Sequence, residues 1–237
     1  MKITEYINNL EWLPPPISCD TPISKNIKSP LPNTASCVAF CGAAGSGKTS
    51  AAVGWLTNAN MYYKVFHHVF IVMPKNSRLS LAGDPFKKHP QEKMFDDLDL
   101  QVLEYVQEHC QVEAPQGHHT LLFIDDCAAS LKNNDIQNLF KKLIFNRRHL
   151  KLTIQFLVQS YNSIPLQIRK NLSHLVIFKP RNKLEMQLIG SEIIFLTKDE
   201  QLKLSNFVFD KPFNFMFLET STNKIYKNFN LLELNES

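Results

Sequence analysis

Gly42-Ala43-Ala44-Gly45-Ser46-Gly47-Lys48-Thr49 is the stretch of this sequence that decides its fold. It matches the pattern G-x-x-x-x-G-K-[ST], in which glycines let backbone N–H groups curl around phosphate oxygens. The lysine of such a loop, here Lys48, reaches the β- and γ-phosphates, and the Thr49 hydroxyl can ligate Mg²⁺. The loop, together with Ser50 directly after it, is therefore the predicted site for the phosphates of a nucleotide.

The residues on either side of the loop have the properties that this motif requires. Residues 36–41 are apolar and indicate a short buried strand, and residues 48–56 indicate a helix. The N-terminus of such a helix aims the positive end of its dipole at the bound anion. Seven glycines occur in the whole chain, and three of them lie here at the required spacing, which argues against a chance match.

Downstream of the loop, short apolar segments alternate with helical ones. Strands are predicted at residues 68–73, 120–124, 152–158 and 175–178, and helices at residues 100–108, 135–149 and 165–171. This alternation indicates a mainly parallel sheet with helices on both faces.

Two segments depart from the alternating pattern. Residues 74–97 are polar and contain Pro85 and Pro90, so a long loop or insertion is predicted there. Near the C-terminus Phe213, Phe215 and Phe217 alternate with other residues, and together with residues 224–229 they predict an antiparallel hairpin at the sheet edge.

The composition indicates one domain preceded by an arm. With 237 residues, of which 44% are hydrophobic, the chain can bury one sizeable core. Residues 1–35 hold six of the 13 prolines and predict an extended N-terminal arm, which leaves residues 36–237 as the phosphate-binding domain. A net charge of +4 permits a polyanionic partner without requiring one.

Several sequence features predict a soluble intracellular protein. The five cysteines form no C-x-x-C pair, and we interpret them as reduced. The first residues do not resemble a signal peptide, and no apolar run approaches the ~18 residues of a membrane span. The pairs His67-His68 and His118-His119 have no cysteine or acidic residue at metal-ligand spacing, so surface imidazoles are expected.

Two carboxylates follow the apolar strand predicted at residues 120–124. Because a strand tip beside the loop is where Mg²⁺ needs an acidic partner, Asp125 is the second predicted metal ligand after Thr49. Asp126 is then placed to polarise an attacking water. The alternative is a solvated turn that ends the strand.

Polar residues also flank the strand predicted at residues 152–158. Gln159 follows it, and a neutral amide beside the γ-phosphate can orient water, although it can also simply cap the next turn. Arg147 and Arg148 precede the strand and suit the C-terminal end of a helix dipole. Alternatively, one of them, or Arg169 or Arg181, is an arginine finger that stabilises charge on the transferred phosphoryl group.

Taken together, these segments resemble the FtsK/HerA superfamily, and within it the genome-packaging ATPases of poxviruses, other large eukaryotic DNA viruses and virophages. The resemblance extends from about residue 36 to residue 182. Its specific part is the block Phe-Asn-Arg-Arg-His-Leu at residues 145–150, followed by Phe-Leu-Val-Gln-Ser-Tyr-Asn-Ser-Ile-Pro at residues 156–165. The wider superfamily often carries Glu where this chain has Asp126, which is one methylene shorter.

The resemblance implies a RecA-like (ASCE) P-loop core that binds ATP and Mg²⁺ between the subunits of a homo-oligomeric ring, a pentamer or a hexamer. Hydrolysis would drive movement of double-stranded DNA, contacted through its backbone, in a viral factory or virion. The short chain leaves no room for a separate module that reads DNA sequence, so a partner such as a capsid vertex protein is expected to select the genome. The resemblance supports roles for Lys48, Thr49, Asp125, Gln159 and, as the finger acting in trans, Arg147 or Arg148.

Three alternatives remain open at this stage. A cellular or mobile-element translocase of the FtsK/HerA type shares the same chemistry. A nucleotide-dependent assembly switch would turn over slowly and ignore DNA, whereas the pair Asp125-Asp126 together with Gln159 favours hydrolysis. A small-molecule kinase would need an arginine-rich lid, which residues 74–97 resemble only weakly.

Overall fold

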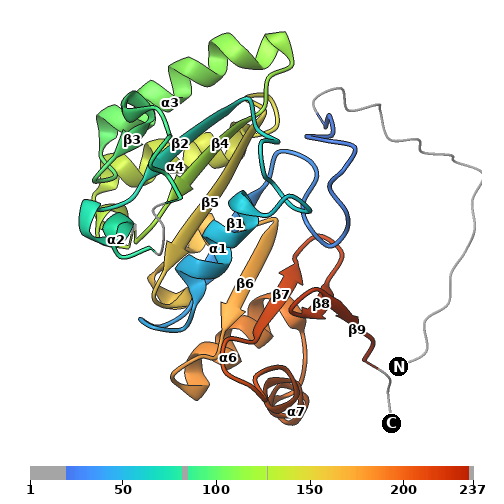
Figure 1. Ribbon diagram of the computed structural model, residues 1–237. Helices are drawn as coiled ribbons and strands as arrows, with labels where there is room; N and C mark the ends of the chain where they lie inside the picture. Colours follow the sequence, from blue (N-terminus) through green and yellow to red (C-terminus); the bar gives the residue numbers. More distant parts are fainter. Residues whose placement is uncertain (1–19, 82–84, 127, 235–237) are drawn as a thin grey trace, which may run out of the picture.

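The computed structural model describes residues 20–81, 85–126 and 128–234. Within this part of the chain, strands form one nine-stranded sheet in the order β3-β2-β4-β5-β1-β6-β7-β8-β9, which crosses Figure 1 from left to right. The strands are β1 Cys37–Cys41, β2 His68–Val72, β3 Met94–Phe95, β4 Thr120–Ile124, β5 Leu152–Val158, β6 His174–Phe178, β7 Phe215–Glu219, β8 Lys224–Lys227 and β9 Asn230–Leu232.

Strands β1 to β6 pair in parallel, and β7, β8 and β9 add an antiparallel edge beside β6. The predicted fold class, a mainly parallel sheet with an antiparallel C-terminal edge, is therefore confirmed.

The helical elements are α1 Lys48–Thr57, α2 Lys75–Leu79, η1 Gln91–Lys93, α3 Leu100–Glu113, η2 Ala114–Gln116, η3 Ser130–Lys132, α4 Asn134–Asn146, η4 Tyr161–Ser163, α5 Leu166–Arg169, α6 Lys183–Ile189, the π-helix η5 Gly190–Ile194 and α7 Lys198–Val208.

Both faces of the sheet are buried, and this is why its central strands are mostly apolar, although β5 also buries Thr153 and Gln155. In β1, Cys37, Ala39 and Cys41 pack with α3 to α7, whereas Val38 and Phe40 pack with α1 on the other face. Successive side chains of a strand point to opposite faces, so a strand in the middle layer is buried at every position and forms a nearly continuous hydrophobic run.

Residues 20–35 contain no helix or strand and pack on the α1 face of the sheet. Ile23, Ile27 and Leu31 are buried there, and the Tyr62 hydroxyl donates a 2.6 Å hydrogen bond to the Pro32 carbonyl. The rest of the expected N-terminal arm, residues 1–19, lies outside the described residues, and the domain boundary at residue 36 stays a prediction.

Helix ends follow local capping chemistry. Asp99 caps α3 by accepting a 2.8 Å hydrogen bond from the Val102 N–H, as predicted, and the helix continues to Glu113, beyond the expected end at residue 108. Asn133 caps α4, which ends at Asn146 and not at residue 149 as predicted. The two arginines at 147 and 148 therefore lie in the turn that leads into β5.

Two further expectations need correction. Residues 74–97 are not a featureless loop, since α2, η1 and β3 lie within them and β3 pairs with β2 as the sheet edge. Phe213 does not belong to the hairpin, because β7 begins two residues later and Phe213 has a left-handed backbone with φ 65°.

Three helical elements, α6, η5 and α7, were not predicted from the sequence. The Thr197–Glu200 capping box, in which both reciprocal hydrogen bonds are present, was the available signal for α7. No helix in the described part of the chain is long and apolar enough to cross a membrane.

Candidate active site

Three predicted site segments meet at one edge of the sheet because β1, β5 and β4 are neighbouring parallel strands. The phosphate loop follows the last residue of β1, Gln159 follows β5, and Asp125 follows β4. The Gly42 N–H donates to the Val158 carbonyl (3.1 Å), and the Asp125 N–H donates to the Val72 carbonyl (2.8 Å). These bonds extend the ladder past the strand ends and hold the loops in register at the carboxyl edge.

The loop itself has the backbone that an anion cradle requires. Gly45 and Gly47 have φ values of 78° and 93°, which L-residues with a side chain rarely adopt. A Cβ on Gly42 would lie 2.6 Å from the Ser46 Oγ and 2.9 Å from the Phe178 Cβ. Gly42 therefore permits the close approach of the loop to β6.

The N-terminus of α1 is open to a ligand. No side chain caps it, so its first-turn N–H groups remain available to an anion. The Ser46 Oγ is buried without a hydrogen-bond partner among the described residues. An orphaned hydroxyl and an uncapped helix start fit a bound phosphate chain.

Thr49 and Asp125, the two predicted oxygen ligands of Mg²⁺, lie next to each other in the structure. The Thr49 Oγ1 lies 3.5 Å from the Asp125 Oδ1, and Asp125 is 7% exposed. Burial raises the pKa of the Asp125 carboxyl above its ordinary value, the Lys48 ammonium lowers it, and the neighbouring Asp126 carboxylate raises it. A carboxylate beside a hydroxyl, both hard oxygen donors, fits a Mg²⁺ ion held against the phosphates.

Asp126 and Gln159 are exposed at the same edge. Asp126 has a left-handed backbone (φ 55°), so the chain turns sharply after Asp125, which is buried. The two adjacent aspartates therefore occupy different environments, one inside and one facing solvent. The division of roles between a metal ligand, Asp125, and a group that handles a proton, Asp126, stays a prediction.

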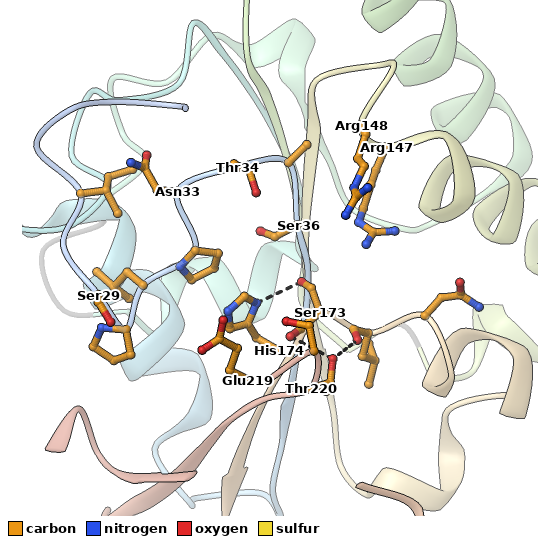
Figure 2. A pocket seen from close by; sticks show the side chains of 18 of the residues that line it. Ser29, Asn33, Thr34, Ser36, Arg147, Arg148, Ser173, His174, Glu219 and Thr220 are labelled. Carbon is orange, nitrogen blue, oxygen red and sulfur yellow. Dashed lines mark hydrogen bonds between the residues drawn. The ribbon is translucent and has the colours of Figure 1, made fainter. Parts of the chain in front are cut away.

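Arg147 and Arg148 lie far from this edge. They precede β5, so they sit at the amino edge of the parallel strands, opposite the phosphate loop. There they line a pocket of about 500 Å³ with Ser36, Ser173 and His174. Figure 2 shows both arginine side chains pointing toward this pocket. The structure therefore does not bring either arginine to the phosphate loop of its own chain.

The two arginines differ in how freely they can act. Arg147 is partly buried, its Nη1 donates to the Ile144 carbonyl at 2.8 Å, and burial lowers its pKa. Arg148 has a side chain that is 47% exposed and forms an ion pair with Asp20 at 3.2 Å. Of the two, Arg148 is the one that another molecule can reach.

The competing arginines also have defined positions. Arg169 forms an ion pair with Glu192 (3.1 Å), and its guanidinium lies over the Tyr161 ring with 5.1 Å to the centroid. Arg181 is exposed in the segment that follows β6, and so lies at the carboxyl edge. Arg169 is thus engaged within its own chain, whereas Arg181 faces solvent beside the site.

One aromatic side chain near the loop was not recognised as part of the site. A Cβ on Gly47 would lie 3.0 Å from Cδ1 of Phe213, so this ring lies against the phosphate loop. Phe213 is 69% exposed, which is unusual for a large apolar side chain. The alternation of Phe213 with Phe215 and Phe217 predicted a strand there, and this pattern concealed the position of Phe213 at the loop.

The fold and this edge define a protein of the P-loop NTPase fold with a RecA-like core. The family model described as Poxvirus A32 protein matches residues 27–211, and the chain belongs to this family. No curated protein sequence matches the chain.

Solved structures share the fold. The DNA-packaging ATPase B204 from Sulfolobus Turreted Icosahedral Virus superposes with a TM-score of 0.63 at 13% identity, over 84% of this chain and 100% of that chain. The genome packaging NTPase B204 from Sulfolobus turreted icosahedral virus 2, in complex with ATP-gammaS, gives 0.62 at 14% identity over 83% and 98%. EssC (ATPases 2 and 3) from Geobacillus thermodenitrificans gives 0.57 at 12% identity over 85% and 40%.

Proposed function

We propose that this chain is an ATP-hydrolysing motor that translocates double-stranded DNA and packages a viral genome. One observation carries the proposal: the phosphate loop, the Asp125-Asp126 pair and Gln159 meet at the carboxyl edge of three adjacent strands. Membership in the Poxvirus A32 protein family and the fold shared with two packaging enzymes support it.

Each group at this edge has a defined task in the proposed reaction, ATP + H₂O → ADP + phosphate. Backbone N–H groups of the loop and Lys48 bind the phosphates, and Thr49 and Asp125 hold the Mg²⁺. A Mg²⁺ ion held by these two residues would supply positive charge against the phosphate oxygens. Asp126 accepts a proton from the attacking water, and Gln159 orients that water without adding charge.

The proposed active unit is a ring of five or six copies. Since Arg148 lies at the amino edge, a ring that places this edge against the carboxyl edge of the next subunit would bring Arg148 to the neighbouring γ-phosphate. There it would act as the finger in trans. The engaged side chains of Arg147 and Arg169 support this choice.

DNA contacts are proposed to involve only the backbone. Lys75, Lys87 and Lys88 are exposed in the segment that follows β2 and leads to β3. Lysines bind phosphates electrostatically and carry no base readout. Selection of the genome would then belong to a partner such as a capsid vertex protein, and the reaction would occur in the viral factory or at the virion.

The first test is ATP hydrolysis by the purified chain with and without linear duplex DNA, at several salt concentrations. We expect DNA to stimulate hydrolysis, salt to weaken the stimulation, and both Lys48→Ala and Asp126→Asn to abolish it. Hydrolysis that ignores DNA at low salt would overturn an autonomous motor and favour a nucleotide-dependent switch. A gene that lies apart from capsid genes would instead favour a cellular or mobile-element translocase.

A further inference from the structure

A second cluster of chemically active side chains lies at the amino edge of the sheet, away from the phosphate loop. His68 is the first residue of β2, His109 and Glu113 stand four residues apart on α3, and His118 lies just before β4. Candidate ligand atoms of His68, His109 and Glu113 all lie within 4.8 Å of one another. The expectation that the histidine pairs lack an acidic partner is therefore wrong.

The hydrogen bonds show how tightly these groups converge. The Glu113 Oε2 lies 3.0 Å from the His68 Nε2 and 2.6 Å from the His118 Nδ1. Two ligands of a tetrahedral zinc ion, each about 2.1 Å from the metal, are themselves about 3.4 Å apart. The observed separations are slightly shorter than this value, so small side-chain shifts would admit an ion.

His109 provides the independent observation that the cluster is built for a ligand. Its Nε2 is buried and has no hydrogen-bond partner among the residues that the structure describes. Its ring packs edge-on against His68 with the ring centroids 4.4 Å apart. Buried polar atoms are nearly always satisfied, so an orphaned imidazole nitrogen beside a carboxylate calls for a missing partner.

We propose that His68, His109 and Glu113, with His118 as the fourth ligand, bind a zinc-type divalent cation. Imidazole and carboxylate are the donors that such an ion takes, and three protein segments supply them. A single ion would connect the start of β2, the last turn of α3 and the segment that enters β4. This proposal goes beyond the motor function and does not depend on it.

The ion would be structural. The seven residues from His119 to Asp125 include the whole of β4, and the six steps between them correspond to about 20 Å at the rise of an extended strand. The cluster is therefore at the opposite end of that strand from the metal ligands of the active site. Binding there would fasten α3 to the sheet edge and leave the nucleotide chemistry unchanged.

Lys93 opposes the ion and makes the proposal testable by a gain of affinity. Its Nζ lies 3.0 Å from the His68 Nδ1. If His68 binds the ion through Nε2, its Nδ1 must carry the ring proton. The Nδ1–H group and the Lys93 ammonium are then two hydrogen-bond donors that face each other. Replacing the ammonium by an amide removes a positive charge and supplies an oxygen that accepts from Nδ1–H, which is the outer partner that a ligating histidine usually has.

The experiment titrates Zn²⁺ into the metal-stripped full-length chain against a chromophoric chelator, and repeats the titration with Co²⁺ to record its visible spectrum. We expect one high-affinity ion per chain and the d–d bands of tetrahedral Co²⁺ without a sulfur charge-transfer band. His109→Gln and Glu113→Gln should each weaken binding by about 10- to 100-fold. Lys93→Gln should tighten binding several-fold, and His149→Gln, an exposed histidine outside the cluster, should change nothing.

Several results would overturn the proposal. Equal affinity in wild type, His109→Gln and Glu113→Gln would mean surface binding, and a sulfur charge-transfer band would place the ion on cysteines. Absence of tight binding in both wild type and Lys93→Gln would leave only a hydrogen-bonded histidine cluster. Circular dichroism of each metal-free variant checks that it folds. If a ligand variant does not fold, the increase in Zn²⁺ affinity expected for Lys93→Gln tests the proposal instead.

Discussion

The Thr49 Oγ1 lies 3.5 Å from the Asp125 Oδ1, although the two residues are 76 positions apart in the chain. The contact exists because β4 and β1 are both neighbours of β5, so their carboxyl ends reach the same edge. The contact joins the phosphate loop to the acidic strand tip, so a change of the Asp125 carboxylate should affect both the bound nucleotide and the stability of the fold.

Asp125→Asn should abolish Mg²⁺-dependent hydrolysis and also stabilise the nucleotide-free protein at pH 7. Burial raises the pKa of the Asp125 carboxyl, so the ionised form is disfavoured in the fold and the charge lowers stability. We expect a Tm increase of about 2 °C at pH 7, a typical size for a small stability gain in such a domain. Because its raised pKa means that Asp125 takes up a proton more readily in the folded protein than in the unfolded chain, acid removes the buried charge from the wild type as well. The Tm gain of Asp125→Asn over the wild type should therefore vanish as the pH falls toward 4.

The matched control for this test is Asp126→Asn, which removes an exposed carboxylate next in sequence. It should abolish hydrolysis without the Tm gain at pH 7. Thermal unfolding of both variants, measured at several pH values from 7 to 4, distinguishes the effect of the Asp125 carboxylate from that of Asp126. Equal Tm changes for the two variants would contradict the assignment of Asp125 as the buried carboxylate whose pKa is raised.

Gln159→Ala should slow hydrolysis by on the order of 10²-fold while the affinity for an ATP analogue stays within a factor of about two, if the amide acts only on the attacking water. Gln159 follows β5 directly and is exposed, so its replacement removes no core packing. Single-turnover hydrolysis and fluorescent-nucleotide binding measure the two quantities. A large loss of affinity without loss of rate would place Gln159 in binding, contrary to the prediction.

Phe213→Ala should weaken nucleotide binding by about 10-fold, the size of the stacking contribution of one aromatic ring on a base. The Phe213 ring lies against Gly47 and is 69% exposed, which places an open aromatic face beside the phosphate loop. Phe195→Ala is the matched control, because Phe195 is 72% exposed and also has a positive φ, 57°. Identical nucleotide affinities for the two variants would refute a contact with the ligand.

Arg148→Ala should lower hydrolysis by on the order of 10³-fold, whereas its own phosphate loop should bind nucleotide normally. Because the proposed site is completed by a neighbour, mixing Arg148→Ala with Lys48→Ala subunits should restore activity. In the mixture, the loop of one subunit meets the intact arginine of the other. No recovery in rings that are shown to contain both variants would rule out action in trans.

Acid should destabilise the fold through His174. Burial lowers the pKa of this ring to about 4, with a smaller effect of the Arg147 charge, whereas the unfolded value is about 6.5. A lowered histidine pKa means that the unfolded chain takes up the proton first, so stability is lost as the pH falls from about 6.5 toward 4. Between pH 7 and pH 5 the loss assigned to this residue is about 2 kcal/mol.

Urea unfolding of wild type and His174→Gln at pH 7 and pH 5 checks this prediction. The wild type should lose about 2 kcal/mol more than the variant between the two pH values. His149→Gln, which replaces an exposed histidine, should follow the wild type. Parallel losses in all three proteins would assign the acid sensitivity to other groups.

Local sequence predicted the elements that have strong periodicity or a fixed motif. The strands at 120–124 and 152–158 have the predicted bounds, because a strand buried on both faces is a nearly continuous apolar run, even though β5 includes Thr153 and Gln155. Residues 74–97 were predicted less well, since β3 is only two residues long and depends on pairing with β2. A strand that short has no periodicity to detect.

The sequence by itself determined the phosphate loop, the acidic strand tip and the parallel sheet, because backbone conformation and side-chain alternation are local properties. Only the tertiary structure decided which distant groups meet. Strand order placed Asp125 beside Thr49, put Arg147 and Arg148 at the opposite edge, and laid Phe213 against Gly47. It also gathered the histidine cluster around Glu113. Such contacts depend on how the strands are ordered and paired, and no short-range pattern in the chain encodes that order.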